Sequence, residues 1–177
     1  MSYKTILVHL DPRPRCSERL GLACRLAAQF EAHLVGLYAP GAPRIPSYAL
    51  AEAGPVLRDV VEQRRAEAAR QAQKQFRDAA ARHGDAGAEW RESAAEPAAA
   101  MCQSARYADL VVAAQPEPQD DAEVRAVAHE LALAAGRPVL FVPYAGRFAT
   151  ADEIWRDVIA DEQRETSRPA GRTCEEE

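Results

Sequence analysis

Short apolar runs that alternate with helical segments are the feature that most constrains the fold. Residues 5–10 read Thr-Ile-Leu-Val-His-Leu, the kind of continuous apolar run that a parallel strand buried on both faces shows. Further runs of this kind occupy residues 34–39, 110–114 and 139–142. Amphipathic segments at helical spacing lie between them. The pattern predicts an α/β protein in which helices cover both faces of a doubly wound parallel sheet.

The first two helical segments carry recognisable start and stop signals. Ser17 is predicted to cap a helix that follows the first strand. Residues 40–55 hold four prolines and two glycines, which predicts an irregular excursion. A long helix is predicted over residues 55–83. Arg64 and Arg65 interrupt its apolar stripe, so part of this helix is expected to reach beyond the core.

The second half of the chain continues the alternation. Residues 88–92 alternate apolar with charged side chains, which predicts a half-exposed edge strand. Pro97 suits the first turn of a short helix. Asp120 or Asp121 is expected to cap the helix that ends at Gly136. Together with the strand at 139–142, this predicts five strands.

Length and charge divide the chain into a body and a tail. The 177 residues are 47% hydrophobic, which suits one domain, predicted over residues 1–146, with an acidic tail over residues 147–177. Up to Thr150 the chain has 18 basic and 18 acidic residues, and the remainder has 4 and 9, so the net charge of −5 lies in the tail. This balance argues against a nucleic-acid binder. With no apolar run of membrane-spanning length and no signal peptide, a cytoplasmic protein is expected.

The turn after the run at 110–114 lacks what a phosphate-binding loop needs. It reads Gln-Pro-Glu-Pro-Gln-Asp-Asp over residues 115–121. A phosphate loop uses small residues whose backbone N–H groups close on the anion. Here two prolines remove N–H groups and three carboxylates add negative charge. The turn therefore argues against a bound triphosphate.

Three segments together resemble the universal stress protein family. They read Tyr-Lys-Thr-Ile-Leu-Val-His-Leu-Asp at 3–11, Ala-Arg-Tyr-Ala-Asp-Leu-Val-Val at 105–112 and Gly-Arg-Pro-Val-Leu-Phe-Val-Pro at 136–143. The resemblance covers roughly residues 1 to 145. It implies a five-stranded sheet in the order 3-2-1-4-5, with helices on both faces, and homodimers formed through strand five.

The resemblance also implies where a nucleotide would bind. Family members that bind nucleotides carry a Gly-x-x-Gly, nine-residue, Gly-Ser/Thr motif, whose places fall here at Ala114, Glu117 and the pair 125–126, so none is retained. Asp11 and Leu37 match positions that lie beside the nucleoside, and they define a residual half-site. The alternatives are that Asp11 serves as a turn or cap acceptor and that Leu37 packs in the core.

Other reactive residue types predict no catalytic centre. His9 lies within an apolar strand and is interpreted as a hydrogen-bonded core histidine. Cys16, at the start of a helix, is a candidate redox-active thiol with a lowered pKa. The four cysteines and four histidines show no metal-ligand spacing, and no metal is expected.

Residues 146–150 read Gly-Arg-Phe-Ala-Thr. This segment resembles the connector between the two repeats of family members that carry two repeats in one chain. In such members the first repeat commonly lacks the phosphate loop. The hypothesis is that this chain is a free-standing or truncated first repeat. The alternative for the tail is a short helix around residues 154–159, which covers the body or a protein partner, followed by disorder.

The sequence therefore favours a non-catalytic stress-response binding or regulatory module, homodimeric, without a cofactor and without strong ATP binding. No nucleic acid and no membrane are expected as partners. The alternative is an ATP- or AMP-binding universal stress protein with slow hydrolysis, which depends on the half-site at Asp11 and Leu37.

Overall fold

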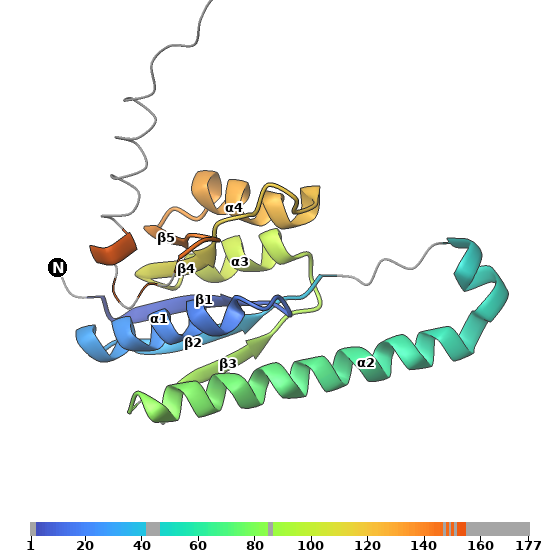
Figure 1. Cartoon of the computed structure of the whole chain (residues 1–177), viewed down its shortest axis with the longest axis horizontal. Coiled ribbons are helices and arrows are strands. Elements are labelled where there is room, and N and C mark those ends of the chain that lie inside the picture. The colour runs from blue at the N-terminus through green and yellow to red at the C-terminus, as the bar shows by residue number, and fades with distance from the viewer. Residues whose placement is uncertain are drawn as a thin grey trace, which may run out of the picture.

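The strands form one parallel sheet in the order β3-β2-β1-β4-β5, with helices on both faces (Figure 1). The computed structural model describes residues 3–41, 47–84, 87–146, 148, 150 and 152–154, with the side chains of 47–56 left out. The strands are β1 (Thr5–Leu10), β2 (His33–Tyr38), β3 (Glu89–Glu92), β4 (Leu110–Ala114) and β5 (Val139–Val142). The helices are α1 (Cys16–Phe30), α2 (Ser47–Arg82), α3 (Pro97–Ala105) and α4 (Ala122–Ala134). The predicted fold class and strand order are confirmed.

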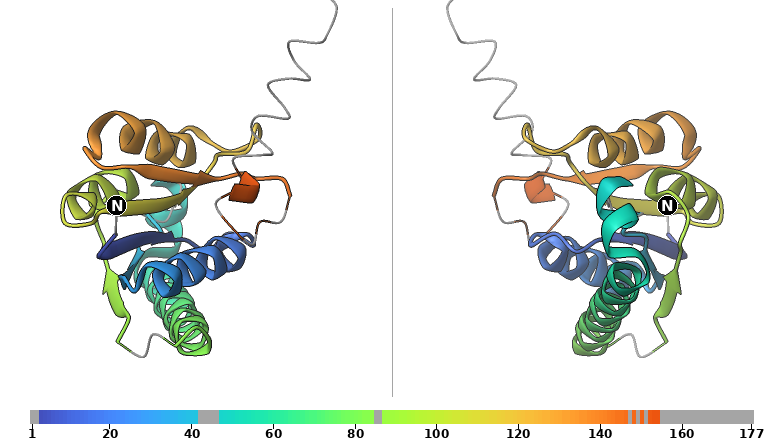
Figure 2. Two further views of the ribbon diagram at one scale, coloured as in Figure 1. Left: turned by 90° about the vertical axis from the view of Figure 1, so that its left-hand side faces the viewer. Right: turned by 90° about the vertical axis from the view of Figure 1, so that its right-hand side faces the viewer.

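Two apolar layers enclose the sheet, because β1 alternates its side chains between them. Ile6, Val8 and Leu10 pack in the layer formed with α1 and α2. Leu7 packs in the opposite layer, with α3 and α4. Figure 2 shows the two helix pairs on opposite faces of the sheet. Since β1 and β4 are neighbours whose helices go to opposite faces, a crevice forms at their carboxyl ends, the usual ligand position in such sheets.

The start of α1 differs from the prediction. The helix begins at Cys16, and its N-cap is Arg15, which makes no side-chain capping hydrogen bond. Ser17 lies inside the first turn, where its Oγ donates to the carbonyl of Pro14 at 3.4 Å. The prediction that Ser17 caps the helix is therefore wrong. A backbone hydrogen bond from Cys16 to the Arg13 carbonyl, at 3.0 Å, closes the turn before the helix instead.

Helix α2 is longer than predicted. It spans 36 residues and is helical from Ser47, so the later part of the segment predicted to be irregular is helix; residues 42–46 lie outside the described residues. The helix continues through Pro55, although proline removes one helical hydrogen bond. No side chain from residue 57 to 68 is buried, and burial begins at Ala69. The expectation that part of this helix reaches beyond the core is confirmed (Figure 1).

The remaining elements agree with the sequence pattern. β3 pairs with β2 and lies at one end of the strand order, with no second strand partner in the described part of the chain. α3 begins at Pro97, and the Glu96 carboxylate accepts from the N–H of Ala99 at 2.9 Å. Asp121, one of the two predicted caps, accepts from the N–H of Val124 at 3.1 Å at the start of α4. Caps and breakers therefore place these boundaries correctly.

The chain beyond β5 returns over α1. Arg15 Nη2 donates to the Gly146 carbonyl at 2.6 Å, and Arg25 Nη2 donates to the Phe148 carbonyl at 2.8 Å. Ile154 is buried in the layer on the α1 side. The expected continuation of the tail helix to residue 159 and the predicted disorder lie outside the described residues. Among the described helices, none combines the length and the apolar character needed to cross a membrane.

A close approach between β2 and α2 provides a test of this packing. A methyl group at Gly36 would lie 2.5 Å from Cε2 of Phe76 and 2.9 Å from Cδ1 of Leu10. We expect Gly36→Ala to lower the free energy of unfolding by about 1–3 kcal/mol, because overpacking forces side chains from their rotamers. Urea denaturation monitored by circular dichroism measures the change.

A matched control is Gly21→Ala in α1, where the added methyl has only an ordinary 3.4 Å contact with Arg25. This change should be neutral or stabilising, by up to about 1 kcal/mol, because alanine favours a helix interior. Equal stability of Gly36→Ala and wild type would contradict the described packing of Phe76 on β2.

Candidate functional site

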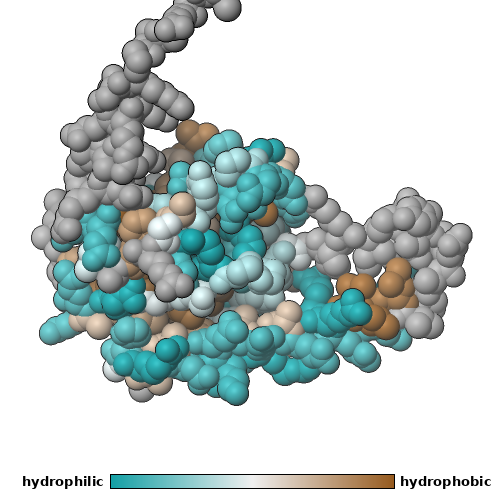
Figure 3. Space-filling model, in the orientation of Figure 1, coloured by the Kyte–Doolittle hydropathy of each residue, from teal (hydrophilic) through white to brown (hydrophobic). Residues whose placement is uncertain are grey.

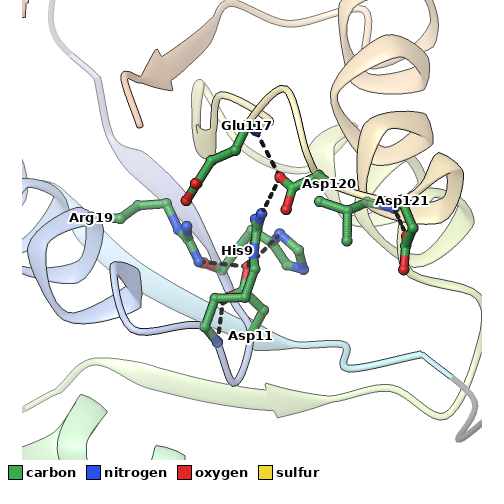
Figure 4. A network of polar contacts seen from close by, with 8 residues as sticks. His9, Asp11, Arg19, Glu117, Asp120 and Asp121 are labelled. Carbon is green, nitrogen blue, oxygen red and sulfur yellow. Dashed lines mark hydrogen bonds and ion pairs between the residues drawn. The ribbon is translucent and has the colours of Figure 1, made fainter. Parts of the chain in front are cut away.

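A cluster of charged side chains lies at the carboxyl ends of β1 and β4, with Asp11 at its centre (Figure 4). Asp11 follows β1 directly and is 8% exposed. Its Oδ1 accepts from the backbone N–H of Arg13 at 3.1 Å, which closes a tight turn. Its Oδ2 accepts from Arg13 Nε at 3.1 Å and Nη2 at 3.0 Å. Asp11 therefore binds groups of its own chain through both oxygens.

A second arginine reaches the same carboxylate from α1. Arg19 is 2% exposed, and its Nη2 lies 3.0 Å from Oδ2 of Asp11. Its Nε donates to the carbonyl of His9 at 2.8 Å. Burial alone would raise the pKa of Asp11, but the charge of Arg19, with that of Arg13 and that of His9 when protonated, outweighs burial and lowers the pKa to about 2. Asp11 is therefore ionised at any physiological pH.

Arg13 connects this pair to the turn that follows β4. Its Nη1 donates to Oδ2 of Asp120 at 3.0 Å. The same oxygen accepts from the N–H of Glu117 at 2.7 Å, and the N–H of Asp120 donates back to the Glu117 carbonyl at 3.0 Å. Asp120 therefore does not cap α4. It shapes the acidic turn and links that turn to the β1 loop through Arg13.

Four cavities adjoin this ion-pair network, and Arg13 and Ala114 line two of them. These two lie beside the end of β4. The larger has a volume of about 240 Å³ and is otherwise lined by Pro14, Arg15, Arg19, Gln115, Glu117, Asp120, Val142, Pro143 and Tyr144. The smaller has a volume of about 180 Å³ and is otherwise lined by His9, Asp11, Pro12, Ala39, Pro40, Pro97, Asp121, Glu123, Val124 and Val127. Each is smaller than the roughly 300–1,000 Å³ of ordinary ligand pockets.

Among the described residues that line the smaller cavity, His9 is the one buried side chain with a polar atom that has no hydrogen-bond partner. It is 4% exposed, and Nε2 has no hydrogen-bond partner there. Burial lowers its pKa from 6.5 to about 4, so the ring is neutral. Asp11 Oδ2 lies 3.9 Å from Nδ1, which favours the proton on that nitrogen. Nε2 then has a lone pair that can accept a hydrogen bond.

The residues predicted from the sequence take different places. Asp11 lies at the centre of the site. Leu37 is buried in the layer with α3 and α4 and lines none of the four cavities described, whereas Ala39, two residues further on, lines the smaller one. Whether either contacts a nucleoside stays a prediction. The lowered pKa expected for Cys16 is wrong, because burial raises the pKa of this thiol.

Sequence reasoning missed both arginines. Arg19 precedes Ala23 by four residues and therefore lies on the apolar face of α1, where an arginine needs an acidic partner. Asp11 was a carboxylate within reach, so the ion pair between Arg19 and Asp11 could have been predicted from the sequence. Arg13 gave no such signal, because its contact with Asp120 spans 107 residues. Among the described residues, no three His, Cys, Asp or Glu side chains gather closely enough to hold a metal ion.

Several solved structures share this fold. Universal stress protein UspA from Lactobacillus plantarum is 20% identical, with a TM-score of 0.65, and the match covers 80% of this chain and 99% of that one. A universal stress family protein from Burkholderia pseudomallei is 27% identical, with a TM-score of 0.52 and coverage of 80% and 96%. A universal stress protein in complex with cAMP is 22% identical, with a TM-score of 0.55 and coverage of 80% and 98%.

These matches identify the class of fold. No protein-family model matches the sequence, and no curated protein matches it either. The chain nevertheless has the universal stress protein fold, and the family resemblance predicted from the sequence is confirmed by its structural neighbours.

The pKa values of the site predict two windows of acid destabilisation. The pKa of His9 is about 4 in the folded chain and 6.5 in the unfolded chain. As the pH falls from 6.5 to 4, only the unfolded chain therefore gains a proton at His9. That difference removes about 3 kcal/mol of stability. Asp11, at about 2 against 3.8, stabilises the fold above pH 3.8 and loses about 2 kcal/mol as the pH falls from 4 to 2.

Urea denaturation at a series of pH values tests this assignment. His9→Gln should flatten the loss between pH 6.5 and 4, because glutamine does not titrate there. His129→Gln, at an exposed position of α4, should leave the profile as in wild type. An unchanged slope in His9→Gln would contradict a buried neutral His9.

Proposed function

We propose that the chain is a non-catalytic binding module of universal stress type whose crevice excludes nucleoside triphosphates. The observation that carries this proposal is the ion-pair network in the crevice. Asp11, the nucleoside position of the family, is bound by Arg13 and Arg19, and Arg13 is also bound by Asp120. A ligand at Asp11 would have to displace contacts that the chain already makes.

Electrostatic repulsion supports the proposal that ATP binds weakly. A triphosphate would enter a crevice whose turn carries Glu117 and Asp120, and like charges about 6 Å apart repel by roughly 3 kcal/mol at an effective dielectric of 20. Arg13 could offset this repulsion only by leaving Asp120. The volumes of about 240 and 180 Å³ on either side of Arg13 also favour a ligand smaller than ATP.

A second candidate is a nucleoside or cyclic nucleotide held in the smaller cavity. Its support is His9 Nε2, a buried acceptor that has no partner among the described residues. A cavity of about 180 Å³ admits one ring system, because an engineered cavity of about 150 Å³ binds benzene. The structural neighbour in complex with cAMP supports this class of ligand.

The proposal includes a homodimer, because the family resemblance implies one formed through strand five. β5 ends the sheet order, so its outer edge has no strand partner among the described residues. An unpaired edge exposes backbone N–H and C=O groups that another strand can bind. This edge therefore supports pairing of two copies.

Calorimetric titration of the full chain with ATP, AMP and adenosine tests the ligand class. We expect no binding of ATP at micromolar concentration and no ATP hydrolysis. Asp120→Asn should bind ATP at least tenfold more tightly than wild type, because it removes a negative charge and releases Arg13 for the phosphates. Its affinity for uncharged adenosine should not change.

Asp78→Asn is the control for the change in charge, since Asp78 is exposed on α2 and should leave ATP affinity at the wild-type value. Micromolar ATP binding by wild type, weakened by Asp11→Asn, would overturn the proposal. Adenosine binding without ATP binding would select the second candidate.

A further inference from the structure

The polar side chains that line the smaller cavity are mostly hydrogen-bond acceptors. Three of them are the carboxylates of Asp11, Asp121 and Glu123, which accept and do not donate when ionised. A fourth is His9, whose Nε2 is buried and has no hydrogen-bond partner among the described residues. Because the ring is neutral and its proton is on Nδ1, Nε2 is an acceptor as well.

The side-chain donors of this lining are already engaged within the chain. Arg13 donates through Nε and Nη2 to Asp11 and through Nη1 to Asp120. Nδ1 of His9 faces Oδ2 of Asp11 at 3.9 Å. Three further lining residues are prolines, which have no backbone N–H group: Pro12, Pro40 and Pro97. A ligand that enters this cavity therefore has to bring its own donors.

The charge at the start of α4 favours a cation among such ligands. Asp121 is the N-cap of α4, and Glu123 lies in its first turn. Their two negative charges exceed the roughly half a positive charge that the dipole places at a helix N-terminus. A phosphate or carboxylate anion would meet acceptors of its own charge and leave both sides without a hydrogen bond. The lining therefore disfavours anions and favours donors that carry a positive charge.

Size and shape narrow the cation to an organic one. Among the described residues, no three His, Cys, Asp or Glu side chains gather closely enough to hold a metal ion. The other side chains of the lining are small and apolar: Ala39, Ala114, Val124 and Val127. The volume of about 180 Å³ admits one ring, since an engineered cavity of about 150 Å³ binds benzene. A planar cation with an apolar part fits both the acceptors and the apolar wall.

We propose that the smaller cavity binds a small planar organic cation of the amidine or guanidine type. Its N–H groups donate to Nε2 of His9 and to the carboxylate of Glu123. Its apolar part lies against Val124 and Val127. This inference rests on the proposed function, because it names the ligand class of the binding module. It departs from a nucleoside, whose base carries ring-nitrogen acceptors as well as donors.

Calorimetric titration of the full chain with benzamidine, benzamide and benzoate tests the need for donors and positive charge. The three probes share one ring and differ in the polar group, which is a donor-only cation, a neutral amide with one acceptor, or an acceptor-only anion. We expect benzamidine to bind with a Kd of about 1 mM or lower, which a ligand of this size can reach. Benzamide should bind at least tenfold more weakly, and benzoate should not bind. Equal affinities for the three probes would overturn the proposal, and so would the absence of benzamidine binding at about 10 mM.

Substitutions in the lining test where the cation binds. His9→Phe should weaken benzamidine binding at least tenfold because it removes the Nε2 acceptor, and Glu123→Gln should do the same because it removes a charge. Glu130→Gln is the matched control, since Glu130 is exposed on the same helix and does not line the cavity. Circular dichroism establishes that each variant is folded, and the half-buried Glu123 provides the test if His9→Phe does not fold. Wild-type affinity for benzamidine in Glu123→Gln would overturn the proposal.

The projecting part of α2 offers an aromatic probe another apolar surface (Figure 3). Val60 is 40% exposed there, and Val60→Ser should leave benzamidine binding at the wild-type value. Loss of binding in Val60→Ser would place the probe on α2 and overturn the proposal. Failure of this inference is distinct from failure of the proposed function: ATP binding at micromolar concentration overturns the function, whereas adenosine binding without benzamidine binding overturns only the cation.

Discussion

The buried ion pair between Asp11 and Arg19 sets the arrangement at the carboxyl end of the sheet. Removing a carboxylate and a guanidinium from water costs several kcal/mol for each ion, so the pair needs further polar contacts. Arg19 also donates a hydrogen bond to the His9 carbonyl, and Asp11 also accepts hydrogen bonds from Arg13. These contacts join the end of β1 to the first turns of α1. They also place Arg13 in the crevice, where it reaches the turn after β4.

The crevice supplies from its own chain the charges that a bound anion would otherwise bring. In α/β proteins that bind phosphate, the N–H groups and positive dipole of a helix N-terminus face the anion. Here the carboxylate of Asp121 accepts from Val124 at that end of α4, and Asp120 accepts from Arg13. The acidic turn therefore acts as an internal anion. This accounts for a turn with three carboxylates next to two buried or half-buried arginines.

Local sequence signals predicted the fold better than the site. Strands such as β4 were placed correctly because a strand buried on both faces must be apolar throughout. The start of α2 was missed, because Pro55 signals a first turn and yet lies inside the helix. Asp11 was found through the resemblance to the universal stress protein family, whose nucleoside position it matches. The contact of Arg13 with Asp120 was not predictable, since only the folded sheet brings residues 107 positions apart together.

The segment that leaves β2 passes the rim of the smaller cavity. Gly41 has a φ of +78°, and a methyl group there would lie 3.2 Å from the Glu123 carboxylate and 3.3 Å from Pro97. Glu123 and Pro97 also line the smaller cavity, so the chain passes the rim of that cavity before it enters α2. A side chain at Gly41 would be strained by both its backbone conformation and its neighbours. The rim of the smaller cavity therefore depends on a glycine at this position.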